Sequence, residues 1–278
     1  ILTSWNGLML AAFAEAARAL DRDDYRTITE RNADFLLREL RQENGRLLRT
    51  WKACPEGTEG AGEAKLNGYL EDYAYLIEGL LELYQTTFDP HWFLAAHELA
   101  ETMTAHFQAP DGGFFDTSDD HESLITRPRG LQDNATPSGN AMATTVLLKL
   151  AGLTNEVRYV DIGHEALAQM ESMMAQYPLG FGQWLQALSY TLAKPKEIAI
   201  IGKLPKADTQ AMLRVAAENY QPFQIIALGD PNTTTPVVPL LQDRKQIDGR
   251  ATAYVCVAFS CLSPVTESEA LRSLLERP

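Results

Sequence analysis

The stretch from residue 68 to residue 89 constrains the fold most, because it is apolar on almost every side of a helix. Glu71 and Asp72 fall in its first turn, where free backbone N–H groups and the helix dipole favour negative charge. The pattern predicts a helix buried between other helices, whose two first-turn acids either cap the helix or take part in chemistry. Its two apolar stripes are Tyr73, Ile77, Leu80, Leu81 and Tyr84, and Tyr69, Leu76 and Leu83.

Composition and charge narrow the function. A chain of 278 residues, 45% hydrophobic, is long enough for one large domain or two smaller ones. The net charge of −13 is spread along the chain, which argues against nucleic acid and anionic membrane as partners. No apolar run approaches the ~20 residues needed to span a bilayer, and no signal peptide is evident. We expect a cytoplasmic protein, and a first residue Ile1 in place of Met indicates a fragment or a processed form.

The three cysteines are too few and too poorly spaced for a disulfide framework or a four-ligand zinc site. Cys256 and Cys261 lie in a strand-like run, residues 253–261, where alternation places them on opposite faces. We therefore expect separate buried thiols and not a redox pair, in keeping with a reducing cytosol.

A buried helix is repeatedly followed by an exposed one. Residues 4–20, with Ser4 as the predicted N-cap, and residues 68–89 are apolar. Amphipathic helices are expected to follow them at residues 23–40 and 90–107. A third such pair starts at residue 138, and a last helix is expected over residues 181–193.

Two connections, residues 43–57 and 109–127, contain Gly beside acidic or amide residues and short β-like runs, and both are predicted to be β-hairpins. Helical hairpins with insertions on one side indicate an array, but the spacing is nearly double the ~34 residues of a tetratricopeptide solenoid and is irregular. The predicted fold is mainly α, an incomplete (α/α) toroid of inner and outer helices over residues 1–195. Residues 196–278 are predicted to form a small α/β lobe.

Five motifs occur in order: L-T-S-W-N-G-L-M, E-D-Y-A-Y-L-I-E-G-L-L-E-L-Y, G-G-F-F-D-T, D-N-A-T-P-S-G-N and A-Y-V-C. Together they resemble the C-terminal portion of the YyaL-type, spermatogenesis-associated protein 20 family, whose longer members begin with a thioredoxin-like domain. The resemblance implies an α/α toroid similar to that of six-hairpin glycosidases and N-acylglucosamine 2-epimerases. These residues contain no C-x-x-C motif, so the resemblance carries no redox function over to this chain.

In such a toroid the starts of the inner helices and both hairpins meet at one mouth of the central cavity. Aromatic platforms with carboxylates and amides suit a sugar, because its C–H faces stack and its hydroxyls need hydrogen-bond partners. The residues expected to bind the substrate are Trp5, Asn6, Trp51, Tyr69, Glu71, Phe115, Arg127, Arg129, Asn134, Ser138, Asn140 and Trp184.

Carboxylates across this mouth are the predicted acid and base. Asp72 is the first candidate, since aromatic neighbours raise a carboxyl pKa, and helix capping is the equal alternative. Asp116 and Asp133 are the second candidates, with turn or loop roles as the alternative. Arg127 and Arg129 are expected either to clamp an anionic substituent or to be solvated loop charges.

The related epimerases use histidines, but none of the five histidines here begins an inner helix. The sequence thus predicts a carbohydrate-active domain of hydrolase or isomerase type that works through carboxylates, without metal or cofactor. The alternative is a non-catalytic module that binds a ligand or partner for an attached thioredoxin-like domain.

About seven helices cannot close a ring that needs about twelve. The first helix is apolar on nearly all sides, and nothing precedes it in the sequence to cover one face. We expect preceding helices of a longer parent chain, or a second copy, to cover that face.

Overall fold

The computed structural model describes residues 1–55, 62–122, 125–257 and 260–276. The chain is mainly helical with small sheets, and it divides into two compact units. The first unit contains residues 1–148 and 159–187, and the second contains residues 149–158 and 188–278. The sequence analysis placed its boundary at residue 195, whereas the second unit also takes in residues 149–158 and 188–195.

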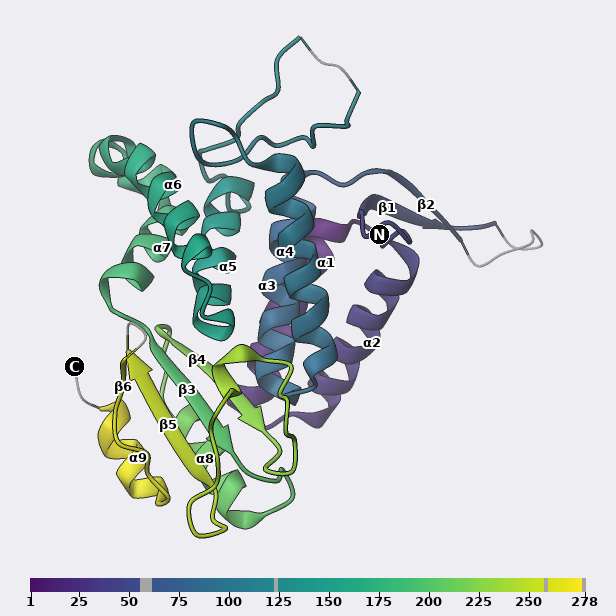
Figure 1. Ribbon diagram of the computed structural model, residues 1–278. Helices are drawn as coiled ribbons and strands as arrows, with labels where there is room; N and C mark the ends of the chain where they lie inside the picture. The colour runs from purple at the N-terminus through teal and green to yellow at the C-terminus, as the bar shows by residue number, and fades with distance from the viewer. Residues whose placement is uncertain (56–61, 123–124, 258–259, 277–278) are drawn as a thin grey trace. The chain divides into compact units, whose positions relative to one another are not determined.

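The first unit consists of helices that follow the predicted positions closely. In Figure 1, α3 lies alongside both α1 and α4. Residues 149–158, at the end of α5 and the start of α6, and the part of α7 beyond residue 187 belong to the second unit. The helices are α1 (Thr3–Leu20), α2 (Asp23–Glu39), α3 (Leu70–Thr87), α4 (Pro90–Phe107), α5 (Gly139–Thr154), α6 (Val157–Gln176), the 3-10 turn η1 (Pro178–Gly180) and α7 (Gly182–Leu192).

Helix α3 is buried on nearly all sides, as its two apolar stripes predict. It approaches α1 so closely that backbone meets backbone. A Cβ added to Gly7 would lie 2.6 Å from the carbonyl carbon of Tyr75, and one added to Gly79 would lie 2.9 Å from the Gly7 oxygen. Glycine at these two positions therefore allows the α1–α3 contact to form.

Helix α1 buries only one face. Trp5 is 65% exposed and Met9 is 57% exposed, so the apolar face opposite α3 is uncovered by the described residues. Ser4 is not the N-cap, because the helix already begins at Thr3 after Leu2, and Leu2 makes no side-chain cap. The prediction of Ser4 as the N-cap is therefore wrong. Ser4 lies inside the first turn of α1, and its N–H is bonded to the carboxylate of Asp72 in α3.

The first predicted hairpin, residues 43–57, is confirmed only in part, because one of the two paired strands lies beyond that segment, and the second is wrong. Strands β1 (Leu48–Ala53) and β2 (Gly62–Asn67) pair antiparallel, while the connecting residues 56–61 lie outside the described part. Between α4 and α5 the described residues form a loop that has no strand and only one isolated bridge, Gln108 to Phe114. Gly112 and Gly113, at φ 94° and 66°, belong to the turn inside this bridge. Beyond it the N–H of Asp116 bonds to the carbonyl of Pro128, so the pairing does not extend into a hairpin.

The second unit is the predicted small α/β lobe. Its sheet has the order β4-β3-β5-β6, with β3 and β4 parallel and the other pairs antiparallel. Its elements, besides residues 149–158 and the end of α7, are β3 (Lys196–Ile201), α8 (Ala207–Ala217), β4 (Gln224–Gly229), the 3-10 turn η2 (Pro239–Leu241), β5 (Thr252–Val257), β6 (Ser260–Cys261) and α9 (Ser268–Leu275).

The two cysteines of this sheet were predicted wrongly. The expected single strand ends at Val257, and β6 returns antiparallel to β5, so that Cys256 and Cys261 are direct cross-strand partners. They form a disulfide. Because opposite residues of paired strands share a face, the expectation of two separate thiols on opposite faces fails.

Candidate functional site

The carboxylate of Asp72 joins three elements of the first unit. Its two oxygens accept the backbone N–H groups of Ser4 in α1 and Tyr69 before α3, each at 2.9 Å. One oxygen also pairs with Arg49 of β1 at 3.1 Å. The side chain has no exposed surface, and burial raises its pKa to about 6, while the Tyr69 N–H and Arg49 oppose that rise. Asp72 thus caps α3 and ties it to α1 and β1.

Glu71 lies at the same helix end but reaches the surface. Its carboxylate is 35% exposed and pairs with Arg49 at 3.0 Å. The guanidinium of Arg49 also lies over the ring of Tyr69, with 4.5 Å between its central carbon and the ring centroid. Glu71, Arg49 and Tyr69 therefore form an accessible group of one acid, one cation and one aromatic ring.

Asp116, in the loop after α4, is held against this helix end. Its backbone oxygen accepts the N–H of Leu70 at 2.9 Å, and both of its carboxylate oxygens accept the N–H of Gly130, at 2.9 and 2.8 Å. Burial raises the pKa of Asp116, and the nearby charge of Glu71 raises it further. Glu71 and Asp116 are thus two partly exposed carboxyl groups at the start of α3, and the charge of Glu71 acts on the pKa of Asp116.

Asp133 is a structural acid in this conformation. One oxygen accepts the N–H of Ser138 at 2.7 Å, and the other accepts the N–H of Gln183 at 2.8 Å. It therefore ties the segment before α5 to the start of α7. Ser138 in turn accepts the N–H of Ala141 at 3.1 Å and caps α5.

The amides predicted to bind substrate are engaged with neighbouring groups. Asn140 is fully buried, and its side-chain oxygen accepts the N–H of Phe114 at 2.7 Å. Asn6 accepts from the amide of Asn32 at 3.1 Å. Asn134 is exposed and accepts the N–H of the next residue.

The two predicted clamp arginines stack on a single ring. Arg127 and Arg129 lie over Phe115, at 4.0 and 4.6 Å from its centroid. Arg129 pairs with Asp111, and Arg127 donates to the carbonyl of Thr117 at 2.5 Å. Both arginines hold the loop together through these contacts.

The three predicted tryptophan platforms differ in exposure. Trp5 faces solvent, and Trp51 packs edge-on against Phe35 at 5.2 Å. Trp184 is 1% exposed and donates its indole N–H to the carbonyl of Leu131 at 2.8 Å. Of the three, Trp5 offers the largest free ring surface.

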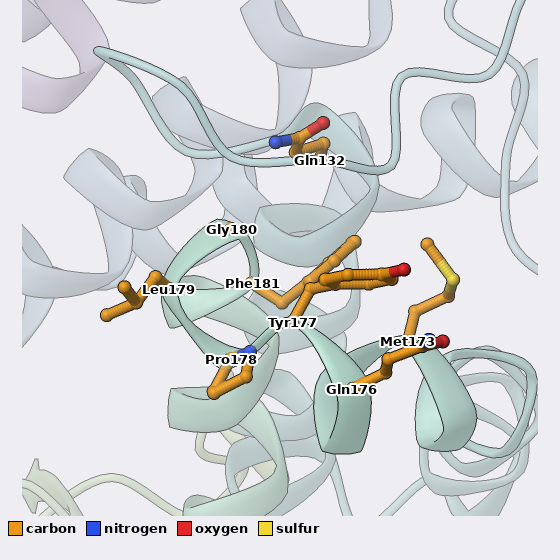
Figure 2. Close-up of a pocket in the computed structure, with 8 residues that line it drawn as sticks. All are labelled: Gln132, Met173, Gln176, Tyr177, Pro178, Leu179, Gly180 and Phe181. Carbon is orange, nitrogen blue, oxygen red and sulfur yellow. The ribbon is translucent and has the colours of Figure 1, made fainter.

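The first unit also contains a pocket of about 540 Å³ that the sequence analysis missed (Figure 2). The ring of Tyr177 and the amide of Gln132 both line it. Asp133 donates its N–H to the carbonyl of Gly180 at 2.9 Å, which holds the loop against one wall. The available signal was the helix-ending Tyr-Pro-Leu-Gly turn. The lining residues are Gln132, Met173, Gln176, Tyr177, Pro178, Leu179, Gly180 and Phe181.

The loop over residues 133–139 runs between this pocket and the start of α3. At one end Asp133 bonds to Gly180, and at the other a Cβ on Gly139 would lie 3.2 Å from the Glu71 nitrogen. The structure thus brings Tyr69, Glu71, Asp72 and Asp116 together, and it connects Asp133 and Ser138 to them through the chain.

One metal-like cluster occurs elsewhere in this unit. Ligand atoms of His106, Asp119 and Asp120 lie within 4.8 Å of one another, and they are half-buried or exposed. Asp120 already pairs with Arg46 at 2.5 Å, and that positive charge repels a cation. We assign no metal to it.

Successive helices in one unit and a small α/β sheet in the other define a mainly helical protein. The chain belongs to the spermatogenesis-associated protein 20 family. It is 31% identical to human spermatogenesis-associated protein 20 over 281 residues and to the rat protein over 283 residues, and it spans 36% of the length of each. An uncharacterised protein of Caenorhabditis elegans is 22% identical over 280 residues, which cover all of this chain and 38% of that protein.

No family model matches the chain. Within the described residues, none of the helices is both long and apolar enough to cross a bilayer.

Proposed function

We propose that this chain is a carbohydrate-active domain whose helices form part of an inner and outer (α/α) toroid, with the sugar bound where α3 begins. The observation that carries the proposal is the pair Glu71 and Asp116, two partly exposed carboxyl groups at the start of α3, where the charge of Glu71 raises the pKa of Asp116. Two such carboxyl groups can divide the acid and base work of glycoside hydrolysis or of a sugar isomerisation.

The environments of the two groups suggest their roles. Asp116 has a raised pKa because it is buried and lies near Glu71, which favours the protonated form that a general acid requires. Glu71 is ion-paired with Arg49 and is the corresponding base or nucleophile. In this proposal Asp72 and Asp133 position the helix starts, which is the alternative to a catalytic role that the sequence left open for each.

The pocket supplies a surface of suitable chemistry for a sugar ring. Tyr177, which is 54% exposed, offers a ring face for the C–H side of a sugar, and Gln132 offers an amide for its hydroxyls. A volume of about 540 Å³ lies within the range usual for small-molecule sites.

Screening a sugar library for thermal stabilisation would identify the ligand, and the same sugar would then be tested for turnover. We expect Asp116→Asn and Glu71→Gln each to lower turnover by about 10²–10⁴ without lowering the melting temperature appreciably. Asp111→Asn, in the same loop but exposed and paired with Arg129, is the matched control and should retain activity. Full activity in both test variants would contradict the assignment.

A non-catalytic ligand-binding module for an attached thioredoxin-like domain is the second candidate. It is favoured by the hydrogen bonding of Asp72 and Asp133, which uses both oxygens of each carboxylate for backbone N–H groups. Sugar binding with no turnover in the unaltered chain would select this candidate.

A further inference from the structure

The disulfide of the second unit lies in a group of charged side chains unrelated to the sugar site. Cys256 is 1% exposed, whereas its partner Cys261 is exposed at the edge of the sheet. One sulfur is thus shielded and the other is accessible to an attacking thiolate from outside.

Arg244 contacts both sulfurs. Its terminal nitrogen lies 3.1 Å from the Cys256 sulfur and 3.5 Å from the Cys261 sulfur. The side chain is fixed by a hydrogen bond from Nε to the carbonyl of Leu240 at 2.6 Å and by stacking on Tyr254, whose centroid is 5.1 Å away. A guanidinium held in this way stabilises a thiolate on either cysteine, which eases opening of the disulfide.

A buried carboxyl group completes the set. Glu197 in β3 is the direct cross-strand partner of Cys256 and therefore points to the same face of the sheet. It is 6% exposed, and burial raises its pKa to about 7, with the charge of Arg244 acting in the opposite direction. A carboxyl group with a pKa raised toward neutrality can give a proton to, or take one from, a sulfur on the same face of the sheet.

We propose that Cys256 and Cys261 form a reversible dithiol–disulfide exchange site, in which Cys261 is attacked by an external dithiol, Arg244 stabilises the thiolates and Glu197 transfers the proton. This site is independent of the proposed sugar chemistry. Its substrate is a dithiol, either a small molecule or a protein that carries two neighbouring thiols.

In the first step of the exchange a thiolate of the dithiol bonds to the Cys261 sulfur and the bond between Cys256 and Cys261 breaks. Cys256 leaves as a thiolate that takes a proton from Glu197. The second thiol of the dithiol then attacks the dithiol sulfur of the mixed disulfide, and its proton restores Glu197. Cys261 leaves as a thiolate beside Arg244 and takes up from solvent the proton that the first thiol lost when it became the attacking thiolate. The chain gains two electrons and two protons, and the external dithiol is oxidised to a disulfide.

The test uses the folded 278-residue chain equilibrated with mixtures of reduced and oxidised dithiothreitol, with free thiols counted by maleimide mass shift. Cys54, which is free, provides a constant internal label. We expect two further thiols to appear without denaturant. We also expect Arg244→Gln to lower the equilibrium constant for reduction at least tenfold, about 30 mV for this two-electron couple.

Three matched variants make the result specific. Arg250→Gln, an exposed arginine paired with Glu267, should leave the equilibrium constant unchanged, and Arg244→Lys should stay within about threefold of the unaltered chain. Glu197→Gln should slow reduction several-fold at pH 7.

Accessibility is tested separately. Cys256→Ser, which leaves the Cys261 thiol, should form a mixed disulfide at least tenfold faster than Cys261→Ser. Reduction that occurs only in denaturant, or equal equilibrium constants for Arg244→Gln and Arg250→Gln, would overturn the proposal and leave a structural disulfide.

Discussion

Replacing Asp72 by asparagine should change how the stability of this chain depends on pH. The Asp72 side chain has no exposed surface, and burial raises its pKa from 3.8 to about 6 in the folded state. In the unfolded chain the group is solvated and titrates near its ordinary value. The two pKa values differ by about 2 units, which corresponds to roughly 3 kcal/mol.

The sign follows from proton binding in the two states. Below about pH 3.8 the carboxyl group is protonated whether the chain is folded or not, and above about pH 6 it is charged in both states. Between these limits only the folded chain holds the proton, so the stability that protonation contributes is lost as the pH rises through about 6. Asparagine does not titrate. The free energy of unfolding of the unaltered chain, minus that of Asp72→Asn, should therefore fall by roughly 3 kcal/mol between pH 4 and pH 7.

Urea denaturation followed by circular dichroism at several pH values measures this difference, and the subtraction removes the titration of all other groups. Glu71→Gln is the control, because its carboxylate is 35% exposed and its ion pair with Arg49 is worth at most about 1 kcal/mol. A difference that rises with pH would refute the reasoning. It would show that Arg49 and the two backbone N–H groups outweigh burial and that the folded pKa of Asp72 lies below 3.8.

Two further predictions concern α1. Gly7→Ala should lower the free energy of unfolding by about 2–3 kcal/mol, because the new methyl group would lie 2.6 Å from the backbone of Tyr75. Ala12→Ser, on the exposed face of α1, is the control and should change that free energy little. Denaturant titration measures both, and equal free energies for the two variants would contradict the close helix contact. The exposed apolar face of α1 should make the 278-residue chain self-associate, which light scattering would detect. The double variant Trp5→Glu, Met9→Glu should be a monomer. An unaltered chain that is monomeric and binds no hydrophobic dye would contradict this prediction.

Helix positions were predictable because they depend on a local property, the period of apolar residues. Pro90 and Asp89 supply a start signal for α4, and the structure begins that helix at Pro90 with the Asp89 side chain as its cap. Strand β1 lies within the predicted hairpin segment, residues 43–57, whereas its partner β2 and the register between the two strands were not predicted. That register joins residues as distant as Leu48 and Asn67, so a local pattern does not determine it.

The conformation of the loop between α4 and α5 also depends on contacts that are distant in the sequence. Its backbone groups are satisfied at a distance, as when Asp116 donates to the carbonyl of Pro128 and Phe115 donates to Phe107. No periodic pattern records such pairings. The Gly beside Asp111 was interpreted as part of a hairpin, but the pairing around it stops after the bridge between Gln108 and Phe114 and the bond from Phe115 to Phe107. From Asp116 onward the backbone groups bond to other segments.

The reversal of the chain between β5 and β6 was equally unpredictable from local sequence. No Gly, Pro, Asn or Asp separates Val257 from Ser260, so the run looks like one alternating strand, and alternation alone then places the two cysteines on opposite faces. Because each residue of a paired strand faces the same way as its partner, the return reverses that conclusion for Cys261.

The same argument explains why the candidate site could only be partly predicted. The first-turn position of Glu71 and Asp72 is a local property, but their roles depend on which residues meet them from elsewhere in the chain. Ser4 approaches Asp72 from a distance of 68 residues and takes one carboxylate oxygen, whereas Glu71, one position earlier, points past that contact to Arg49 and remains partly exposed. The oxygens of Asp72 are occupied by backbone N–H groups, whereas the carboxylate of Glu71 keeps exposed surface. Two adjacent acids in one helical turn thus acquire different environments from contacts made by α1 and β1.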